Sequence, residues 1–113
     1  MMDKLLARVR EDVEAELAEA RKNHGDYFHS MHEGFGVLAE EAQEGADEAK
    51  HVGESMRALF YWLRMNDHER VAHILTNIMN NATLAACEYI QVAAMTHKMI
   101  ASMEEEAHER END

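Results

Sequence analysis

The 113-residue sequence contains no proline, one cysteine and five glycines, and only 6% of its residues are aromatic. The glycines all fall between positions 25 and 53, and β-branched residues are sparse. Long stretches without helix-breaking residues favour helices over strands. We therefore expect an all-α fold. We also expect a single domain over residues 1–113, because a chain of this length is too short to bury two separate cores.

Basic residues are also scarce. The chain has 11 lysines and arginines and 23 aspartates and glutamates, so its formal net charge is −12. Nucleic acids and anionic membrane surfaces both attract a concentrated basic face, so neither partner is expected. The sequence shows no apolar run long enough to cross a bilayer and no hydrophobic signal segment, and Cys87 has no cysteine partner within the chain. These absences favour a cytoplasmic location.

Apolar spacing divides the chain into helices. We expect a first helix within residues 1–22, a second from the Ser30–Glu33 capping box to about residue 51, and a short third over 55–64. Residues 67–103 form one helix or two, with 80–81 as the candidate break. The acidic tail, 104–113, is expected to fray. These elements predict an antiparallel bundle of four to five helices, and nine methionines suit an adaptable interface in a homo-oligomer.

Glu88 is the only formally charged residue between Arg70 and Lys98. Its neighbours are mostly alanine and other apolar residues, so the carboxylate is expected to be partly withdrawn from water. A carboxylate in that position needs a proton, a partner or a metal ion, because desolvation disfavours its charged form. Some other part of the chain should therefore provide a partner for Glu88.

An acidic helix face is the best candidate for that partner. The second predicted helix contains four glutamates on one side: Glu40, Glu41, Glu44 and Glu48. Successive residues of a helix are rotated by about 100°, and this rotation places the four side chains within an arc of roughly 100° on the helix surface. On that helix alone, a solvated acidic face is the ordinary interpretation. Convergence with Glu88 instead favours a hard divalent cation such as Mg²⁺ or Mn²⁺, which prefers oxygen ligands.

These residues resemble the MazG-like all-α nucleoside triphosphate pyrophosphohydrolases, and in particular their short phage-type members. That family has an E-E-x-x-E motif followed on a later helix by E-x-x-D. The run Glu40-Glu41-Ala42-Gln43-Glu44 matches the first motif, and Glu88-Tyr89-Ile90-Gln91 stands at the second. Gln91 replaces the usual aspartate, and the 43 residues between Glu44 and Glu88 exceed the usual spacing. The resemblance covers about residues 24–103.

The resemblance implies Mg²⁺-dependent hydrolysis of a nucleoside triphosphate to a monophosphate and pyrophosphate by a homodimer or tetramer. It also implies roles for individual residues. Glu41, Glu44 and Glu88 become the metal ligands, with Glu48 and Gln91 as outer candidates. Glu40 becomes the residue that orients the attacking water, and Lys98 becomes a phosphate contact. Separately, Asn81 lies below Glu88 on its helix and either contacts substrate, caps a helix break or bridges two helices.

Two other classes of function stay open. Gln91 favours a non-catalytic dimeric interaction module or an inactive relative. Two E-x-x-H pairs, Glu48 with His51 and Glu105 with His108, are typical of di-iron four-helix bundles, although no clear fourth glutamate is present. The aromatic cluster over 60–62 is better explained by a core or dimer interface than by base stacking.

Overall fold

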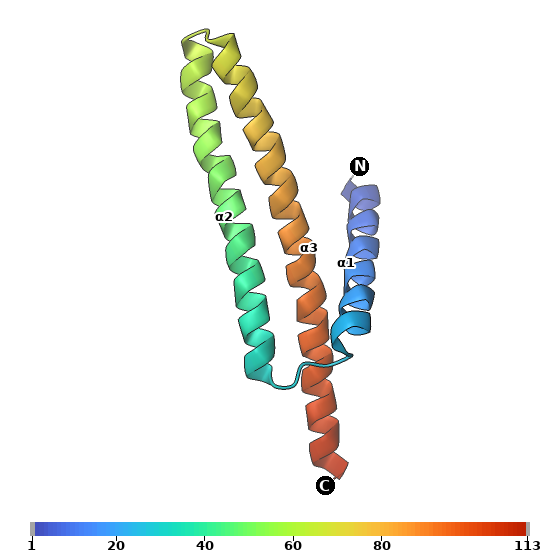
Figure 1. The fold of residues 1–113 in the computed structure, drawn as a ribbon. Coiled ribbons are helices and arrows are strands. Elements are labelled where there is room, and N and C mark those ends of the chain that lie inside the picture. Colours follow the sequence, from blue (N-terminus) through green and yellow to red (C-terminus); the bar gives the residue numbers. More distant parts are fainter. Residues whose placement is uncertain (1, 113) are drawn as a thin grey trace. The chain divides into compact units, whose positions relative to one another are not determined.

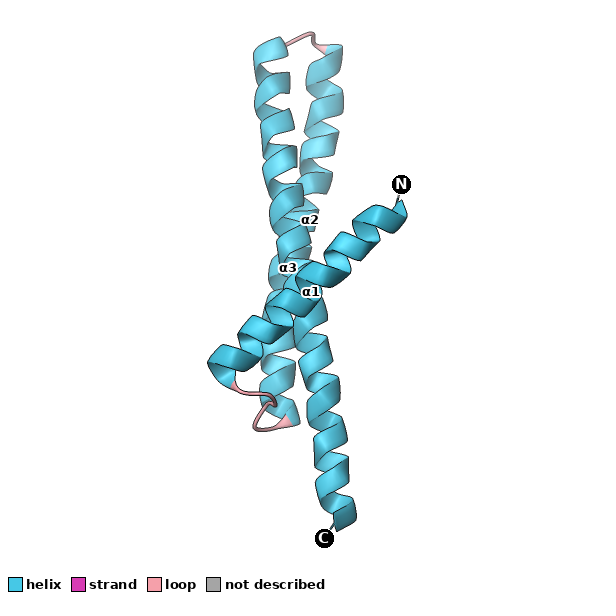
Figure 2. Cartoon of the chain, turned by 90° about the vertical axis from the view of Figure 1, so that its right-hand side faces the viewer, coloured by secondary structure: helices cyan, strands magenta, loops and turns pink. Residues whose placement is uncertain are grey.

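The computed structural model describes residues 2–112, and within that range it contains three α-helices and no strand. These are α1 (Met2–His24), α2 (Met31–Arg64) and α3 (His68–Asn112), joined by two short loops (Figures 1 and 2). The expected all-α fold is confirmed. None of the described helices is long and apolar enough to cross a membrane. Residues 1 and 113, which the predicted first helix and tail include, lie outside the described range.

The loop between α1 and α2 is set by a cap at each of its ends. Gly25 has a φ of 88°, and its backbone N–H donates to the carbonyl of Arg21 over 2.9 Å. This left-handed glycine closes the carboxyl end of α1. The Ser30 hydroxyl accepts from the backbone N–H of Glu33 over 3.1 Å, which confirms the serine half of the predicted capping box.

The turn between α2 and α3 is a Schellman motif. Asn66 has a φ of 54°, and its N–H donates to the carbonyl of Leu63 while the N–H of Asp67 donates to that of Trp62. Asp67 then caps α3, because its carboxylate accepts from the N–H of Arg70 over 3.1 Å. The Arg70 guanidinium lies 4.0 Å from the centroid of the Trp62 ring and covers it. Three residues therefore suffice to reverse the chain.

The chain forms fewer helices than expected because the predicted break near Gly53 and the candidate break at 80–81 do not occur. α2 continues through Gly53, and α3 continues past residues 80–81, so residues 68–103 belong to one helix. A glycine inside a helix costs about 1 kcal/mol relative to alanine, which packing of the helix on a neighbour outweighs. The predicted fraying tail is helical through Asn112, and Arg110 pairs there with Glu106 over 2.9 Å.

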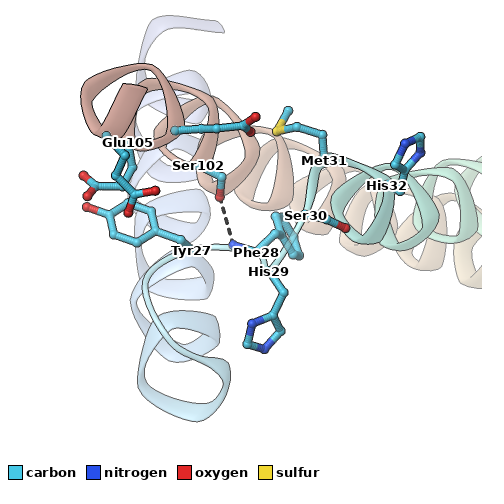
Figure 3. A pocket seen from close by; sticks show the side chains of 10 residues that line it. Tyr27, Phe28, His29, Ser30, Met31, His32, Ser102 and Glu105 are labelled. Carbon is cyan, nitrogen blue, oxygen red and sulfur yellow. Dashed lines mark hydrogen bonds between the residues drawn. The ribbon is translucent and has the colours of Figure 1, made fainter. Parts of the chain in front are cut away.

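The chain divides into two compact units, of which the first combines the residues up to Glu41 with those from Tyr89 onward. Its core contains Val13 from α1 with Ala94 and Met95 from α3, each at most 8% exposed. The loop before α2 is tied to α3 by a hydrogen bond of 2.9 Å from the Phe28 N–H to the Ser102 hydroxyl (Figure 3). This unit therefore rests on α1 and the carboxyl-terminal half of α3.

The second unit, Ala42–Glu88, is a helical hairpin closed by the turn at the top of Figure 1. Its buried and half-buried residues recur every three or four positions on both helices, as in an antiparallel coiled coil. We call this line of residues the seam, and it comprises Gly45, Glu48, Val52, Ser55, Leu59 and Trp62 from α2 with Val71, Ile74, Ile78, Asn81, Ala85 and Glu88 from α3. Of these, Gly45 and Ala85 are buried and the others are half-buried.

Replacing Gly34 with alanine is expected to leave the protein at least about 1 kcal/mol less stable than the matched Gly36→Ala variant. A Cβ at Gly34 would lie 3.0 Å from Phe28 Cδ2 and 3.2 Å from Met99 Cγ, whereas a Cβ at Gly36 meets no atom within 4 Å. Alanine at 36 gains helix propensity without a clash. Urea denaturation of both variants gives the comparison, and equal stabilisation by the two changes would show that α2 has room at Gly34.

Candidate functional site

Three of the predicted metal ligands come together in the structure. Glu41, Glu44 and Glu88 each offer a carboxylate oxygen, and these atoms all lie within 4.8 Å of one another. Glu44 is exposed, and the other two are half-buried. Among residues 2–112, no other group of three or more histidine, cysteine, aspartate or glutamate side chains has this geometry. We call these residues the carboxylate trio.

The lengths of the helices explain why the trio converges. Glu44 lies 20 residues before Arg64, where α2 ends, and Glu88 lies 20 residues after His68, where α3 begins. At 1.5 Å per residue both positions are about 30 Å from the turn, so the hairpin brings them level. Glu41 precedes Glu44 by about one turn of the uninterrupted helix α2 and shares its side. The long interval between the two motifs is therefore the length of this hairpin.

Full ionisation of all three carboxylates in the trio is electrostatically unfavourable. Like charges this close repel one another, and the repulsion is stronger where the side chains are partly shielded from water. A proton, a hydrogen-bond donor or a cation reduces that cost. A divalent cation suits the arrangement because carboxylate oxygens are the ligands that Mg²⁺ and Mn²⁺ prefer. The trio can therefore act as part of a cation site that substrate oxygens and water complete.

The remaining candidates from the second unit lie on the seam. Glu48 follows Glu44 by about one turn and is half-buried, but it does not belong to the trio. Asn81 is also half-buried on the seam, two turns before Glu88. Since α3 is unbroken at this point, Asn81 does not cap a helix break. Its two remaining roles, a bridge between helices and a contact to substrate, both fit a seam position.

The other candidates belong to the first unit, where a cavity of about 520 Å³ opens between α1, α2 and α3. Glu41, Gln91 and Lys98 all line it, whereas Glu40 is exposed at the surface of α2. Lys98 is only 3% exposed, and its Nζ lies 4.5 Å from the centroid of the Phe28 ring. The ring face stabilises the buried ammonium group, which faces a cavity whose wall also contains acidic side chains.

Gln91, which replaces the aspartate of the second motif, already has a partner. Its Nε2 donates to Glu16 Oε2 over 2.7 Å, and Glu16 comes from α1. A hydrogen bond to a carboxylate is stronger than one between neutral groups, so this contact fixes the amide. Only Oε1 of Gln91 remains available as a ligand atom. Gln91 therefore links α3 to α1, a structural role that the E-x-x-D motif does not predict.

Sequence reasoning missed Glu16 and Phe28, which supply the partners of Gln91 and Lys98. Glu16 follows the buried Val13 by three residues, so it borders the apolar stripe of α1, and this position is the one signal that points to it. Phe28 lies in the loop before α2 and has no periodic pattern around it. Both contacts join residues about 70 to 75 positions apart.

A second cavity, of about 470 Å³, lies beside the same loop in the first unit. Its wall includes His29, His32 and Glu105, and Figure 3 shows both histidine rings turned away from Glu105. Within the part of the chain that the structure describes, neither E-x-x-H pair belongs to a group of converging ligands. This cavity therefore shows no arrangement of side chains that would hold a metal ion.

Comparisons of the chain with protein-family models, curated proteins and solved structures find no match. The family resemblance rests on the two acidic motifs.

Proposed function

We propose that this protein is a cytoplasmic, Mg²⁺-dependent nucleoside triphosphate pyrophosphohydrolase that acts as a homo-oligomer. The observation that supports this proposal is the carboxylate trio, whose oxygens lie within 4.8 Å of one another. Two of its members come from the E-E-x-x-E motif, and the third is the first residue of the second motif. Three of the residues that give the family resemblance therefore also converge.

In this proposal Glu41, Glu44 and Glu88 hold the cation, with Glu48 and the free oxygen of Gln91 as outer groups. A bound Mg²⁺ or Mn²⁺ would neutralise phosphate charge, polarise the phosphoryl group and lower the pKa of a bound water. Glu40 directly precedes Glu41 and is exposed, so its carboxylate is accessible to orient the attacking water. Lys98 supplies a positive charge for the triphosphate. Asn81 lies about 25 Å from Lys98 along α3, on the other side of Glu88, and supplies an amide for a different part of the nucleotide.

A second candidate is a non-catalytic helical interaction module. The hydrogen bond from Gln91 to Glu16 favours it, because that contact gives the second motif a structural role in place of an acidic ligand. In this alternative the trio is a remnant of a metal site. The di-iron alternative would require iron in the purified protein, which elemental analysis detects.

The test is incubation of the purified chain with each common ribonucleoside and deoxyribonucleoside triphosphate in the presence of Mg²⁺ or Mn²⁺. We expect at least one nucleotide to yield monophosphate and pyrophosphate in equal amounts, and chelation of the metal to stop the reaction. Release of inorganic phosphate without pyrophosphate would contradict the proposed bond cleavage. No product from any nucleotide would favour the non-catalytic alternative.

A further inference from the structure

Gln91 is a neutral residue one turn after Glu88, and the carboxylate nearest to its amide comes from another helix. Gln91 Nε2 donates to Oε2 of Glu16 over 2.7 Å, and both side chains are half-buried. Gln91 and Glu88 are three residues apart on the uninterrupted helix α3, so they share a side of it. The negative charge that position 91 lacks is therefore present one hydrogen bond away, on α1.

No basic side chain compensates the charge of Glu16. Among residues 2–112, no lysine, arginine or histidine forms an ion pair with its carboxylate. A carboxylate that is already paired with a basic group contributes little to the binding of a further cation, whereas an uncompensated carboxylate attracts one. The charge of Glu16 is therefore available to a cation that binds near Gln91.

The hydrogen bond also prepares the other half of the Gln91 amide. The nitrogen and the oxygen of an amide diverge from one carbon, so Nε2 directed at Glu16 leaves Oε1 directed elsewhere. Donation to a carboxylate polarises the amide and makes its oxygen a better acceptor. Metal-binding histidines use a similar arrangement, in which a carboxylate accepts from the second ring nitrogen and makes the ligand more basic. Glu16 therefore improves Oε1 of Gln91 as an oxygen ligand.

Glu16 and Gln91 line the cavity of about 520 Å³ in the first unit, and Glu41 of the carboxylate trio lines it as well. Lys98 forms another part of its wall and is 3% exposed. Within the described part of the chain, the Lys98 ammonium group has no carboxylate oxygen within 4.0 Å. A buried ammonium group without an anionic partner is unfavourable, so this cavity is suited to a ligand with an anionic group. Glu16 and Gln91 therefore border a space that a ligand can enter.

We propose that Glu16 is a positioning residue of the cation site. Its carboxylate holds the Gln91 amide with Oε1 free for the cation, and it supplies the negative charge that Gln91 lacks. The proposal rests on the proposed function in one respect, because it requires a divalent cation at the carboxylate trio. Helix α1 is then part of the site as well as part of the core.

The test is a Mn²⁺ titration of the full chain, in which paramagnetic resonance measures the free ion. Glu16→Gln keeps an acceptor for Gln91 but removes the charge, so we expect Mn²⁺ to bind at least about tenfold more weakly than to the wild type. The double variant Glu16→Gln with Gln91→Glu exchanges the two groups, and the amide at 16 then donates to the carboxylate at 91. Its Mn²⁺ affinity should return to within about threefold of the wild type.

Glu19→Gln is the matched control. Glu19 lies on the same helix and lines the same cavity as Glu16, but its carboxylate accepts a hydrogen bond from Asn23 and not from Gln91. The substitution removes the same charge from an exposed position, where solvent and salt screen it. Its Mn²⁺ affinity should therefore stay within about twofold of the wild type.

A role of Glu16 limited to holding α1 against α3 predicts a different result. Glu16→Gln would then lower the stability in urea and leave the Mn²⁺ affinity unchanged, and this outcome would overturn the proposal. Equal weakening by Glu16→Gln and Glu19→Gln would also overturn it. So would a double variant that folds but does not recover Mn²⁺ binding, a result that does not depend on the folding of Glu16→Gln alone. A wild type that binds no Mn²⁺ would overturn the proposed function itself, and this proposal with it.

Discussion

Replacing Glu88 with glutamine is expected to lower the Mg²⁺-dependent rate of pyrophosphate release at least about 100-fold, because even partners of metal ligands contribute 10- to 100-fold. The amide keeps the shape of the side chain but removes its negative charge. The two other members of the trio would then hold the cation with one charged ligand fewer. The initial rate of pyrophosphate release, measured for the variant and the wild type at a subsaturating Mg²⁺ concentration, checks this expectation.

Glu54→Gln is the control for Glu88→Gln, since it removes the same charge from an exposed position of α2. Its rate should stay within about twofold of the wild type, because long-range electrostatic effects are screened at ordinary ionic strength. A Glu88→Gln rate close to that of the wild type, in a variant with unchanged helix content, would show that Glu88 does not hold the catalytic cation.

Replacing Met95 with alanine is expected to lower the free energy of unfolding by about 2–4 kcal/mol. Met95 is 8% exposed and packs with Val13 and Ala94, so its truncation opens a cavity where α1 meets α3. Urea denaturation at a fixed protein concentration measures the change, since assembly would add to the apparent stability.

The control for Met95→Ala is Met103→Ala, because Met103 is in the same helix and is 53% exposed. A change at an exposed site should fall within about 0.5 kcal/mol of the wild type. Equal and small effects at both positions would mean that the core of the first unit contributes little to stability, and that α1 is held mainly by contacts such as Gln91 to Glu16.

Local signals predicted the all-α fold and most of the helix ends. Ser30 with Glu33 and the glycine at 25 act within one helical turn, so their spacing alone indicates the caps. The trio was also predictable, because Glu41 and Glu44 share a helix side and Glu88 is isolated among apolar residues. The caps depend on residues that are close together in the sequence. Glu88 is recognisable because it is a single charged residue in an apolar segment.

The continuity of α2 and α3 could not be predicted in the same way. Gly53 and the asparagines at 80–81 weaken a helix locally, and only packing along the hairpin seam determines that the helices continue. The partners of Gln91 and Lys98 were also unpredictable, because Glu16 and Phe28 are distant in sequence and belong to no motif. Tertiary contacts of this kind leave no periodic pattern.

The most direct test of the central claim, that the carboxylate trio binds a divalent cation, is a titration with Mn²⁺ in which paramagnetic resonance measures the free ion. We predict one Mn²⁺ per chain in the wild type, binding at least about tenfold weaker in Glu88→Gln, and unchanged binding in Glu54→Gln. Equal Mn²⁺ binding by the wild type and Glu88→Gln, or no binding by the wild type, would contradict the claim.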